Sequence, residues 1–446
     1  MPAGFSLLDH GRGSRRLASP VLQTEVCEPP WIASSFPRYA SRMQDWRDVS
    51  VWQRLAAEGG ALVAAADAAL AQAESVPAPS VIARFRKSHD AALVAAAFEL
   101  VAARRKARAK FSAADMLWCD VAGVEQASDE RVAAWKAARM RETLGDGASI
   151  QDICSGIGGD ALALAAAGLA VTALDLDPRR AWMTAQNARC ASECGDAEAL
   201  HLAGAALHAD PARRDEVGGA RSWSLDDHKP GRAWIERVLR EARAAAVKFA
   251  PGVDRRDLGD LPLEWEWIES DGALVQAVAW SGAFARAPRS TRATRLSRSG
   301  SAVSISGLPD DARGDRIGVD PRLEPGMFVA EPVAALERAQ LLTEATQGTA
   351  ARELARSLGL VAASSPLPAP WFGSFAFVDE CGRDSAEIAR AIERHGLVAR
   401  SVRVRGRALD ADAVTRAIHA RGDGNAVVFA WREGSGVRVV LTRVTS

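Results

Sequence analysis

The stretch from residue 150 to 180, IQDICSGIGGDALALAAAGLAVTALDLDPRR, constrains the fold more than any other part of the chain. Ile150–Ile153 predicts a short buried strand, and the glycines at 156, 158 and 159 predict a sharp turn that a ligand can approach closely. Ala161–Ala167 favours a helix, and Val171–Leu174 predicts the next strand. The sequence therefore predicts a right-handed βαβ unit that opens a parallel sheet, with a ligand crevice at the carboxyl ends of its strands.

Acidic residues surround this turn and restrict the ligand. The pattern Gly156-x-Gly158-x-x-Ala161 nominally satisfies the dinucleotide fingerprint. However, Asp152 and Asp160 stand where they would repel a pyrophosphate, so they favour a ligand that carries positive charge and no phosphate. Asp175 follows the turn by about twenty residues, where a carboxylate accepts hydrogen bonds from two ribose hydroxyls.

Two of the acids near the turn also have a purely structural interpretation. Asp152 ends a strand and could cap the turn that follows it. Asp177 precedes Pro178, which is typical of the residue that caps a helix. For Asp177, capping and contact with a ligand both stay open.

Composition and charge bound the remaining possibilities. The 446 residues are too many for one hydrophobic core, so we expect two or three domains. The formal net charge is zero, so a nucleic acid or a membrane would have to be met by local patches. Six cysteines are scattered without a disulfide or zinc pattern, and no segment has the character of a signal peptide or a membrane span. We therefore expect a cytoplasmic protein with reduced thiols and no metal site.

The pattern along the chain predicts five segments. They are a disordered leader (1–40), an N-terminal helical region (41–145), the α/β domain (146–300), a linker (301–325) and a small α+β domain (326–446). Within them, residues 51–72, 179–192 and 350–358 favour single helices. Leu263–Ile268 and Ala273–Trp280 alternate on either side of a Ser-Asp-Gly turn and predict an antiparallel hairpin.

The glycine turn resembles a known family. D-x-C-S-G-x-G-G-D followed by A-L-D-L-D-P is similar to the first two motifs of the class I S-adenosylmethionine-dependent methyltransferases. Further segments resemble bacterial methyltransferase-like proteins with a THUMP-like C-terminal domain: Lys110-Phe111, VEQAS, DPARR, VKFAPGVD and VVLTRV. The resemblance implies an α/β fold with a Rossmann-like seven-stranded methyltransferase sheet that ends in an antiparallel hairpin. The N-terminal helical region and the small C-terminal α+β domain would flank this sheet.

The resemblance also implies S-adenosyl-L-methionine as the cofactor. It places Asp152 and Gly156 at the methionine end of the cofactor, Gly158 beneath the adenosyl group and Asp175 on the ribose. With Asp160 at the start of the helix, these residues form the predicted cofactor site.

The same resemblance places Asp210-Pro211-Ala212-Arg213 at the transferable methyl group. Methyltransferases that act on the amino groups of bases have an aromatic residue in this motif, and this chain lacks it. Uracil-C5 enzymes need a cysteine nucleophile after the next strand, and VKFAPG contains none. We therefore expect direct in-line transfer, with Asp210 as the group that orients the acceptor or removes its proton. Arg213 and Arg214 could pair with a substrate phosphate or form a structural salt bridge.

RNA is the expected partner, because true THUMP domains dock structured RNA. Basic residues cluster at 84–87, 104–110 and 390–407, and any of these clusters could follow phosphates or form a solvated face. A non-catalytic RNA-binding or assembly protein is the alternative, favoured by the short segment between Asp177 and Asp210, which shows no acid to read the adenine amino group. A nicotinamide-dependent oxidoreductase is the third possibility.

Overall fold

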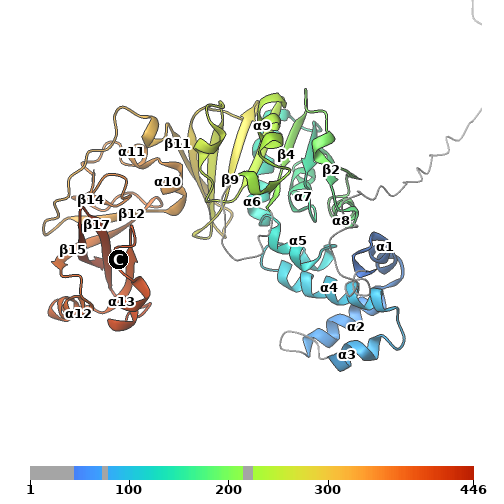
Figure 1. Cartoon of the computed structure of the whole chain (residues 1–446), viewed down its shortest axis with the longest axis horizontal. Coiled ribbons are helices and arrows are strands. Elements are labelled where there is room, and N and C mark those ends of the chain that lie inside the picture. Colours follow the sequence, from blue (N-terminus) through green and yellow to red (C-terminus); the bar gives the residue numbers. More distant parts are fainter. Residues whose placement is uncertain (1–44, 73–78, 214–224, 446) are drawn as a thin grey trace, which may run out of the picture. The chain divides into compact units, whose positions relative to one another are not determined.

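The structure is a computed structural model, and it describes residues 45–72, 79–213 and 225–445 (Figure 1). The predicted leader at 1–40 lies outside the described residues. Residues 46–446 form one compact unit.

The first part of the described chain is helical, as the apolar spacing predicts. Its helices are α1 (Val49–Glu58), α2 (Gly60–Ala71), α3 (Pro79–Phe85), α4 (Ala91–Ala107), α5 (Val121–Gln126) and α6 (Glu130–Leu144). The single helix predicted over 51–72 is wrong, because it is interrupted at Gly59. A side chain there would collide with Leu55, whose Cδ1 would lie 2.4 Å from the added Cβ.

The first sheet has nine strands in the order β11-β10-β8-β9-β7-β4-β1-β2-β3. Its members are β1 (Ser149–Ile153), β2 (Ala170–Asp175), β3 (Ala191–Cys194), β4 (Ala206–Ala209), β7 (Ala244–Phe249), β8 (Glu264–Ser270), β9 (Ala273–Gly282), β10 (Thr291–Leu296) and β11 (Ala302–Gly307). Strands β3, β2, β1, β4 and β7 are parallel neighbours. The hairpin β8–β9 is antiparallel, as predicted, and β9 pairs with β7.

The prediction of seven strands is wrong by two. Strand β10 pairs with β8, and β11 pairs with β10. Strand β11 lies in the segment predicted as a linker, and its residues are mostly exposed at the edge of the sheet. Its sequence, AVSISG, alternates apolar residues with serine, but this short run lies within a Gly-, Ser- and Arg-rich segment that predicted a linker.

The helix predicted over 179–192 is also wrong in length. Helix α8 (Pro178–Ala188) ends where Arg189 adopts a left-handed conformation with φ 51°. The chain then forms β3, which ends at Cys194. Strand β3 therefore lies between β2 and β4 in the sequence, and in the sheet it is the edge strand beside β2.

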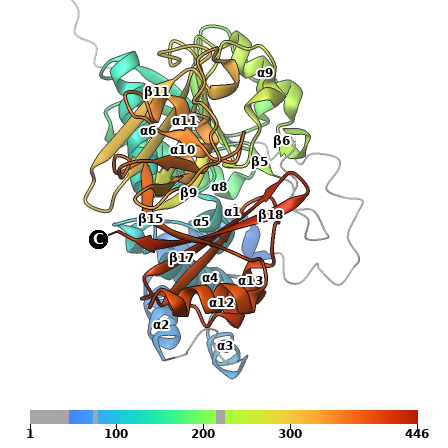
Figure 2. The same ribbon diagram turned by 90° about the vertical axis from the view of Figure 1, so that its left-hand side faces the viewer.

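Helices cover both faces of the first sheet (Figures 1 and 2). Helices α6 and α7 (Gly159–Ala166) pack on one face, against Ile150, Ala244 and Val278. Helices α9 (Arg232–Glu241) and α10 (Ala334–Ala339) pack on the other, against Ile153, Val247 and Trp267. The central strands β4, β7 and β9 therefore send alternate side chains into two different cores, which is the pattern of a sheet buried on both faces.

The second sheet has seven strands in the order β13-β14-β12-β15-β18-β17-β16. They are β12 (Phe328–Pro332), β13 (Arg352–Glu353), β14 (Val361–Ala363), β15 (Phe372–Cys381), β16 (Ala399–Val404), β17 (Ala426–Glu433) and β18 (Gly436–Val444). Helices α12 (Ser385–Arg394) and α13 (Ala411–Ala417) cover one face of it (Figure 2). The helix predicted over 350–358 is wrong, because this segment contains β13 and a turn.

The remaining elements are short. They are the helix α11 (Leu342–Ala345), the two-stranded pair β5 (Ala212–Arg213) and β6 (His228–Lys229), and the 3-10 turns η2 (Asp45–Arg47), η3 (Ala114–Met116), η4 (Ala197–Ala199), η5 (Leu225–Asp227), η6 (Arg255–Leu258) and η7 (Asp310–Ala312). Helix α10 packs on the first sheet, where Thr291 Oγ1 donates to the carbonyl of Ala339 over 2.6 Å. The core between the sheet and α9 thus extends to the residues that begin the second sheet.

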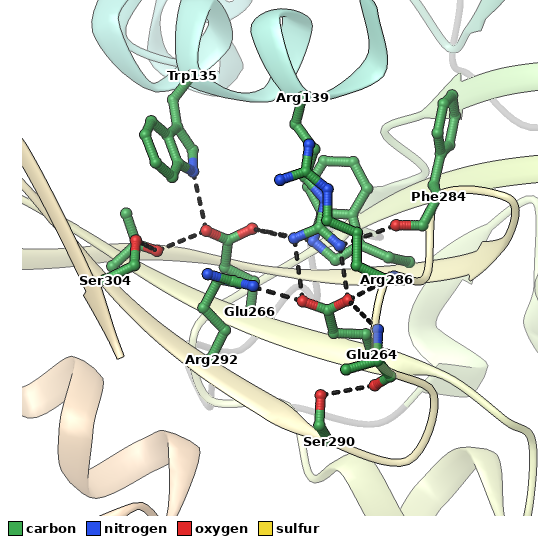
Figure 3. Close-up of polar contacts among 12 residues, drawn as sticks. Trp135, Arg139, Glu264, Glu266, Phe284, Arg286, Ser290, Arg292 and Ser304 are labelled. Carbon is green, nitrogen blue, oxygen red and sulfur yellow. Dashed lines mark hydrogen bonds and ion pairs between the residues drawn. The ribbon is translucent and has the colours of Figure 1, made fainter. Parts of the chain in front are cut away.

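A buried ion network joins α6 to strands β8, β9 and β10 (Figure 3). The acids of β8, Glu264 and Glu266, have no exposed side-chain surface, and Arg139 of α6 contacts both, at 2.7 Å and 3.4 Å. Trp135 Nε1 and Trp280 Nε1 donate to the two oxygens of Glu266, over 2.8 Å and 3.0 Å. A buried ion pair stabilises a fold only when its remaining hydrogen bonds are made. Both oxygens of each carboxylate have partners here, whereas Nε of Arg139 has none among the residues that the structure describes.

We therefore expect Arg139→Met to lower the free energy of unfolding by about 3–5 kcal/mol, because it leaves Glu266 buried without a cation and leaves Glu264 with Arg292 alone. Denaturant titration followed by tryptophan fluorescence measures this loss. Arg298→Met is the matched control, since Arg298 is 88% exposed and pairs with Asp271 at 3.2 Å. The control should cost less than about 0.5 kcal/mol. Equal losses in the two variants would contradict a stabilising role for the network.

Candidate functional site

The glycine turn connects β1 to α7 through left-handed backbone. Cys154, Gly156 and Gly158 have φ angles of 58°, 60° and 82°. A Cβ at Gly158 would lie 2.9 Å from Cα of Thr184 in α8, whereas the nearest atom to a Cβ at Gly156 is a guanidinium nitrogen of Arg180 at 3.9 Å. Gly158 therefore allows close packing of α8, and Gly156 leaves an open space beside the turn.

Asp175 ends β2 and fixes the glycine turn. Its Oδ2 accepts from the backbone N–H of Gly156 over 2.8 Å, and its Oδ1 accepts from that of Asp177 over 2.9 Å. Burial raises the pKa of this carboxyl group above its usual value. Asp177 caps α8 by accepting from the N–H of Arg179 over 2.8 Å, so its capping interpretation is confirmed.

An acid follows the third strand, although the sequence showed no counterpart for it. Asp196 comes two residues after β3 and caps the turn η4, where its Oδ1 accepts from the N–H of Glu198 over 2.9 Å. Strand β3 pairs with β2, and the N–H of Gly195 donates to the carbonyl of Asp175 over 3.0 Å. Asp175 and Asp196 therefore stand at the carboxyl ends of neighbouring strands.

The predicted cofactor residues Asp152 and Asp160 are buried beneath the turn. Asp152 Oδ1 lies 2.7 Å from Nδ1 of His208, its register partner on β4. Asp160, in the first turn of α7, pairs with Lys136 of α6 at 2.7 Å. Burial raises the pKa of Asp152. Burial alone would also raise that of Asp160, but Lys136 holds the pKa of Asp160 well below its usual range.

The predicted catalytic motif follows β4. The N–H of Asp210 donates to the carbonyl of Ile153, and Asp210 Oδ2 lies 2.6 Å from Nζ of Lys248 on β7. Pro211 is buried, and Arg213 belongs to β5. Arg214 lies outside the described residues. The sequence analysis missed Lys248, whose only signal is a lysine inside the apolar segment AVKF that predicts a buried strand.

The N-terminal helices form one wall of the site. Gln126, the last residue of α5, accepts at Oε1 from Nη1 of Arg180 over 3.1 Å, and its carbonyl accepts from Nζ of Lys248 over 3.3 Å. The ammonium of Lys110 donates to the carbonyls of Val124, Glu125 and Ala127, each over 2.8 Å. The end of α5 thus crosses the carboxyl edge of the sheet from α8 to β7, and Lys110 holds it in place.

In residues 45–72, 79–213 and 225–445, we find no group of three or more His, Cys, Asp or Glu side chains arranged to hold a metal ion. Among the same residues, no helix has the length and apolar character that crossing a membrane requires.

The chain is similar to known proteins over most of its length. An uncharacterised S-adenosylmethionine-dependent methyltransferase of Mycobacterium tuberculosis, from strains CDC 1551 and H37Rv, is 28% identical over 320 residues, covering 70% of this chain and 84% of the relative. A putative methyltransferase from Porphyromonas gingivalis W83 has a similar structure, with a TM-score of 0.66 at 15% identity over 86% of this chain and 98% of that one. This structural match shows the fold. No protein-family model matches the chain.

The geometry of the turn predicts unequal effects of alanine at its two glycines. Gly156→Ala should cost about 1–2 kcal/mol of stability, because its φ is left-handed but its surroundings are open. Gly158→Ala should cost at least about 1 kcal/mol more, because the added Cβ also collides with the backbone of α8. Gly168→Ala is the control for backbone strain alone, since its φ is 89° and no atom lies within 4 Å of its added Cβ. Equal unfolding midpoints for the three variants would contradict close packing at Gly158.

Proposed function

We propose that the chain transfers a methyl group from S-adenosyl-L-methionine to RNA. It is an S-adenosyl-L-methionine-dependent methyltransferase, as its similarity to the curated mycobacterial relatives along 70% of its length indicates. The observation that carries the proposal is the carboxylate of Asp175, bonded to the N–H of Gly156 at the carboxyl edge of a parallel sheet. That arrangement is suited to a ribose beside a glycine turn.

The residues present fit this cofactor. Each oxygen of Asp175 accepts one backbone N–H and keeps a second lone pair for a ribose hydroxyl. Asp196 is exposed at the next strand end and would accept from the adenine amino group. The buried acids Asp152 and Asp160 would face the ammonium group of the cofactor's amino-acid end, where an unpaired oxygen of Asp152 suits a cation. When bound, the cofactor supplies a methyl group activated by a sulfonium.

Asp210 is the residue proposed to act on the acceptor. Lys248 holds its Oδ2, so Oδ1 is the oxygen presented toward a substrate. This ion pair fixes the direction of the carboxylate, which can then orient an acceptor amino group or take its proton. Pro211 and Arg213 complete the motif proposed at the reaction centre.

RNA is proposed as the substrate from the THUMP-like resemblance of the C-terminal region together with exposed basic residues. Within the basic segment 390–407, Arg403 and Arg405 pair with Glu331, and Arg394 pairs with Asp379. Arg400 and Arg407 are exposed and could follow phosphates. The N-terminal cluster 104–110 is largely engaged with acids and carbonyls of the protein. The exposed residues Arg84, Arg86 and Lys87 are the better candidates there.

The short connection between the third strand and the fourth supports the non-catalytic alternative, because it contains only the 3-10 turn η4. The aromatic residue that would stack on a base after Asp210-Pro211 is replaced by Ala212 and Arg213. Asp196 is proposed as the acid after the third strand, for which the sequence showed no clear counterpart. Asp152 and Asp160 beneath the turn argue against the pyrophosphate of a nicotinamide cofactor.

We expect calorimetric titration to detect S-adenosyl-L-methionine binding to the wild-type protein. Asp175→Ala should weaken it at least about tenfold, because a charged acceptor is lost from the ribose hydroxyls. Asp177→Ala is the matched control two residues away. It should lose about 1 kcal/mol of stability as a helix cap and keep its affinity for the cofactor. Absence of binding by the wild type would refute the proposed function.

We expect the wild type to incorporate labelled methyl groups into RNA from a strain that lacks this protein, and nucleoside mass spectrometry would identify the product. Asp210→Asn should reduce the rate roughly 100-fold or more while cofactor affinity is unchanged. Cellular DNA and protein serve as competing substrates. Incorporation into either in place of RNA would reject the RNA assignment, and cofactor binding without any incorporation would support the non-catalytic alternative.

A further inference from the structure

Four ionisable side chains from four different elements meet beneath the glycine turn. Lys136 of α6, His208 of β4 and Asp152 of β1 are each 1% exposed, and the side chain of Asp160 in α7 is 11% exposed. They form one chain: Asp152 Oδ1 to His208 Nδ1 at 2.7 Å, His208 Nε2 to Lys136 Nζ at 3.1 Å, and Lys136 Nζ to Asp160 Oδ1 at 2.7 Å. Ser128 Oγ donates to the second oxygen of Asp160 over 2.9 Å.

The contacts assign the protons in this chain. A lysine ammonium can only donate, so Nε2 of His208 must accept from Lys136. The ring N–H that faces Asp152 is then that of Nδ1, which donates to Asp152 Oδ1. Two carboxyl groups, those of Asp152 and Asp160, therefore share one lysine and one imidazole.

One oxygen of the cluster is left without a partner. Asp152 Oδ2 is buried and has no hydrogen-bond partner among the residues that the structure describes. An uncompensated buried carboxylate is unfavourable unless a cation or a donor reaches it. Because the cluster lies directly below the turn that follows β1, a ligand bound at that turn is the one placed to supply the positive charge.

We propose that Lys136 and His208 are positioning residues that hold Asp152 and Asp160 as a fixed anionic receptor for the ammonium group of the cofactor's amino-acid end. This inference rests on the proposed function. Neither residue would touch the cofactor. His208 would keep Asp152 Oδ1 occupied so that Oδ2 faces the ammonium, and Lys136 would hold Asp160 in one orientation at the start of α7.

Two ligands that share the adenosine half distinguish a loss of the ammonium receptor from a general disturbance of the cofactor site. S-adenosylhomocysteine carries the ammonium, whereas 5′-methylthioadenosine lacks the amino-acid end and depends on the ribose and adenine contacts alone. We expect His208→Leu to weaken S-adenosylhomocysteine binding at least about tenfold, because Asp152 loses its donor and takes up a proton. The affinity for 5′-methylthioadenosine should stay within about twofold.

A conservative variant at the same position should restore part of the lost binding. His208→Asn places an amide N–H near the position of Nδ1, so it should recover much of the S-adenosylhomocysteine affinity that His208→Leu loses. If His208→Leu does not fold, the isosteric Asp152→Asn tests the same receptor without changing its volume, and it should show the same selective loss. An equal loss for both ligands, or no loss for either, would overturn the inference.

Lys136→Met tests whether Lys136 acts by orienting Asp160 or through its charge alone. Removal of the ammonium makes the cluster more negative, which by charge alone would strengthen the binding of a cation. A positioning role predicts the opposite, a selective loss of S-adenosylhomocysteine affinity. A gain in that affinity would overturn the role of Lys136. If the wild type binds neither ligand, the proposed function itself fails, which is a different result from wild-type binding that these variants leave unchanged.

Discussion

Helix α6 carries two buried cationic side chains, and the position of this helix on the first sheet depends on the partners that they reach. Lys136 and Arg139 are three residues apart, so both side chains point toward the sheet. Lys136 reaches Asp160 and His208 below the glycine turn, and Arg139 reaches Glu264 and the carbonyl of Phe284 at the antiparallel side. Buried cations are costly unless their hydrogen bonds are made in full. A single register of α6 on the sheet satisfies both sets, so this helix ties the cofactor edge to the antiparallel hairpin.

Local sequence was sufficient to predict the helices and strands that are buried and regular. The unit β1–α7–β2 followed from glycines between apolar runs, and the β8–β9 hairpin followed from alternation around a turn. Prediction failed at exposed edges. Strand β3 is four largely exposed residues after a helix and carries no apolar period. Strand β11 alternates over only a few residues inside a segment rich in Gly, Ser and Arg, which predicted a linker. Residues 350–358 have a helical composition, but tertiary contacts set their conformation as a short strand and a turn.

Some residues of the candidate site could be predicted from local sequence, and others could not. Asp175 could be found because its distance from the turn is set by the length of one βα unit. Asp196 was missed because its strand was taken for helix. His208, Lys136 and Lys248 could not be found, because a lone polar residue in an apolar segment acquires meaning only through register. His208 matters because it pairs beside Asp152, and Lys248 because its strand is the neighbour of the one that ends at Asp210. Such pairings join residues 38 or more positions apart.

The N-terminal helices contact residues of the candidate site. Gln126 accepts hydrogen bonds from Arg180 on one side and from Lys248 on the other, and Lys248 also holds Asp210. A movement of α5 would therefore act on α8 and on the proposed reaction centre together. Since Lys110 fixes the end of α5 through three carbonyls, the strength of that anchor sets how far the two halves of the site can shift apart.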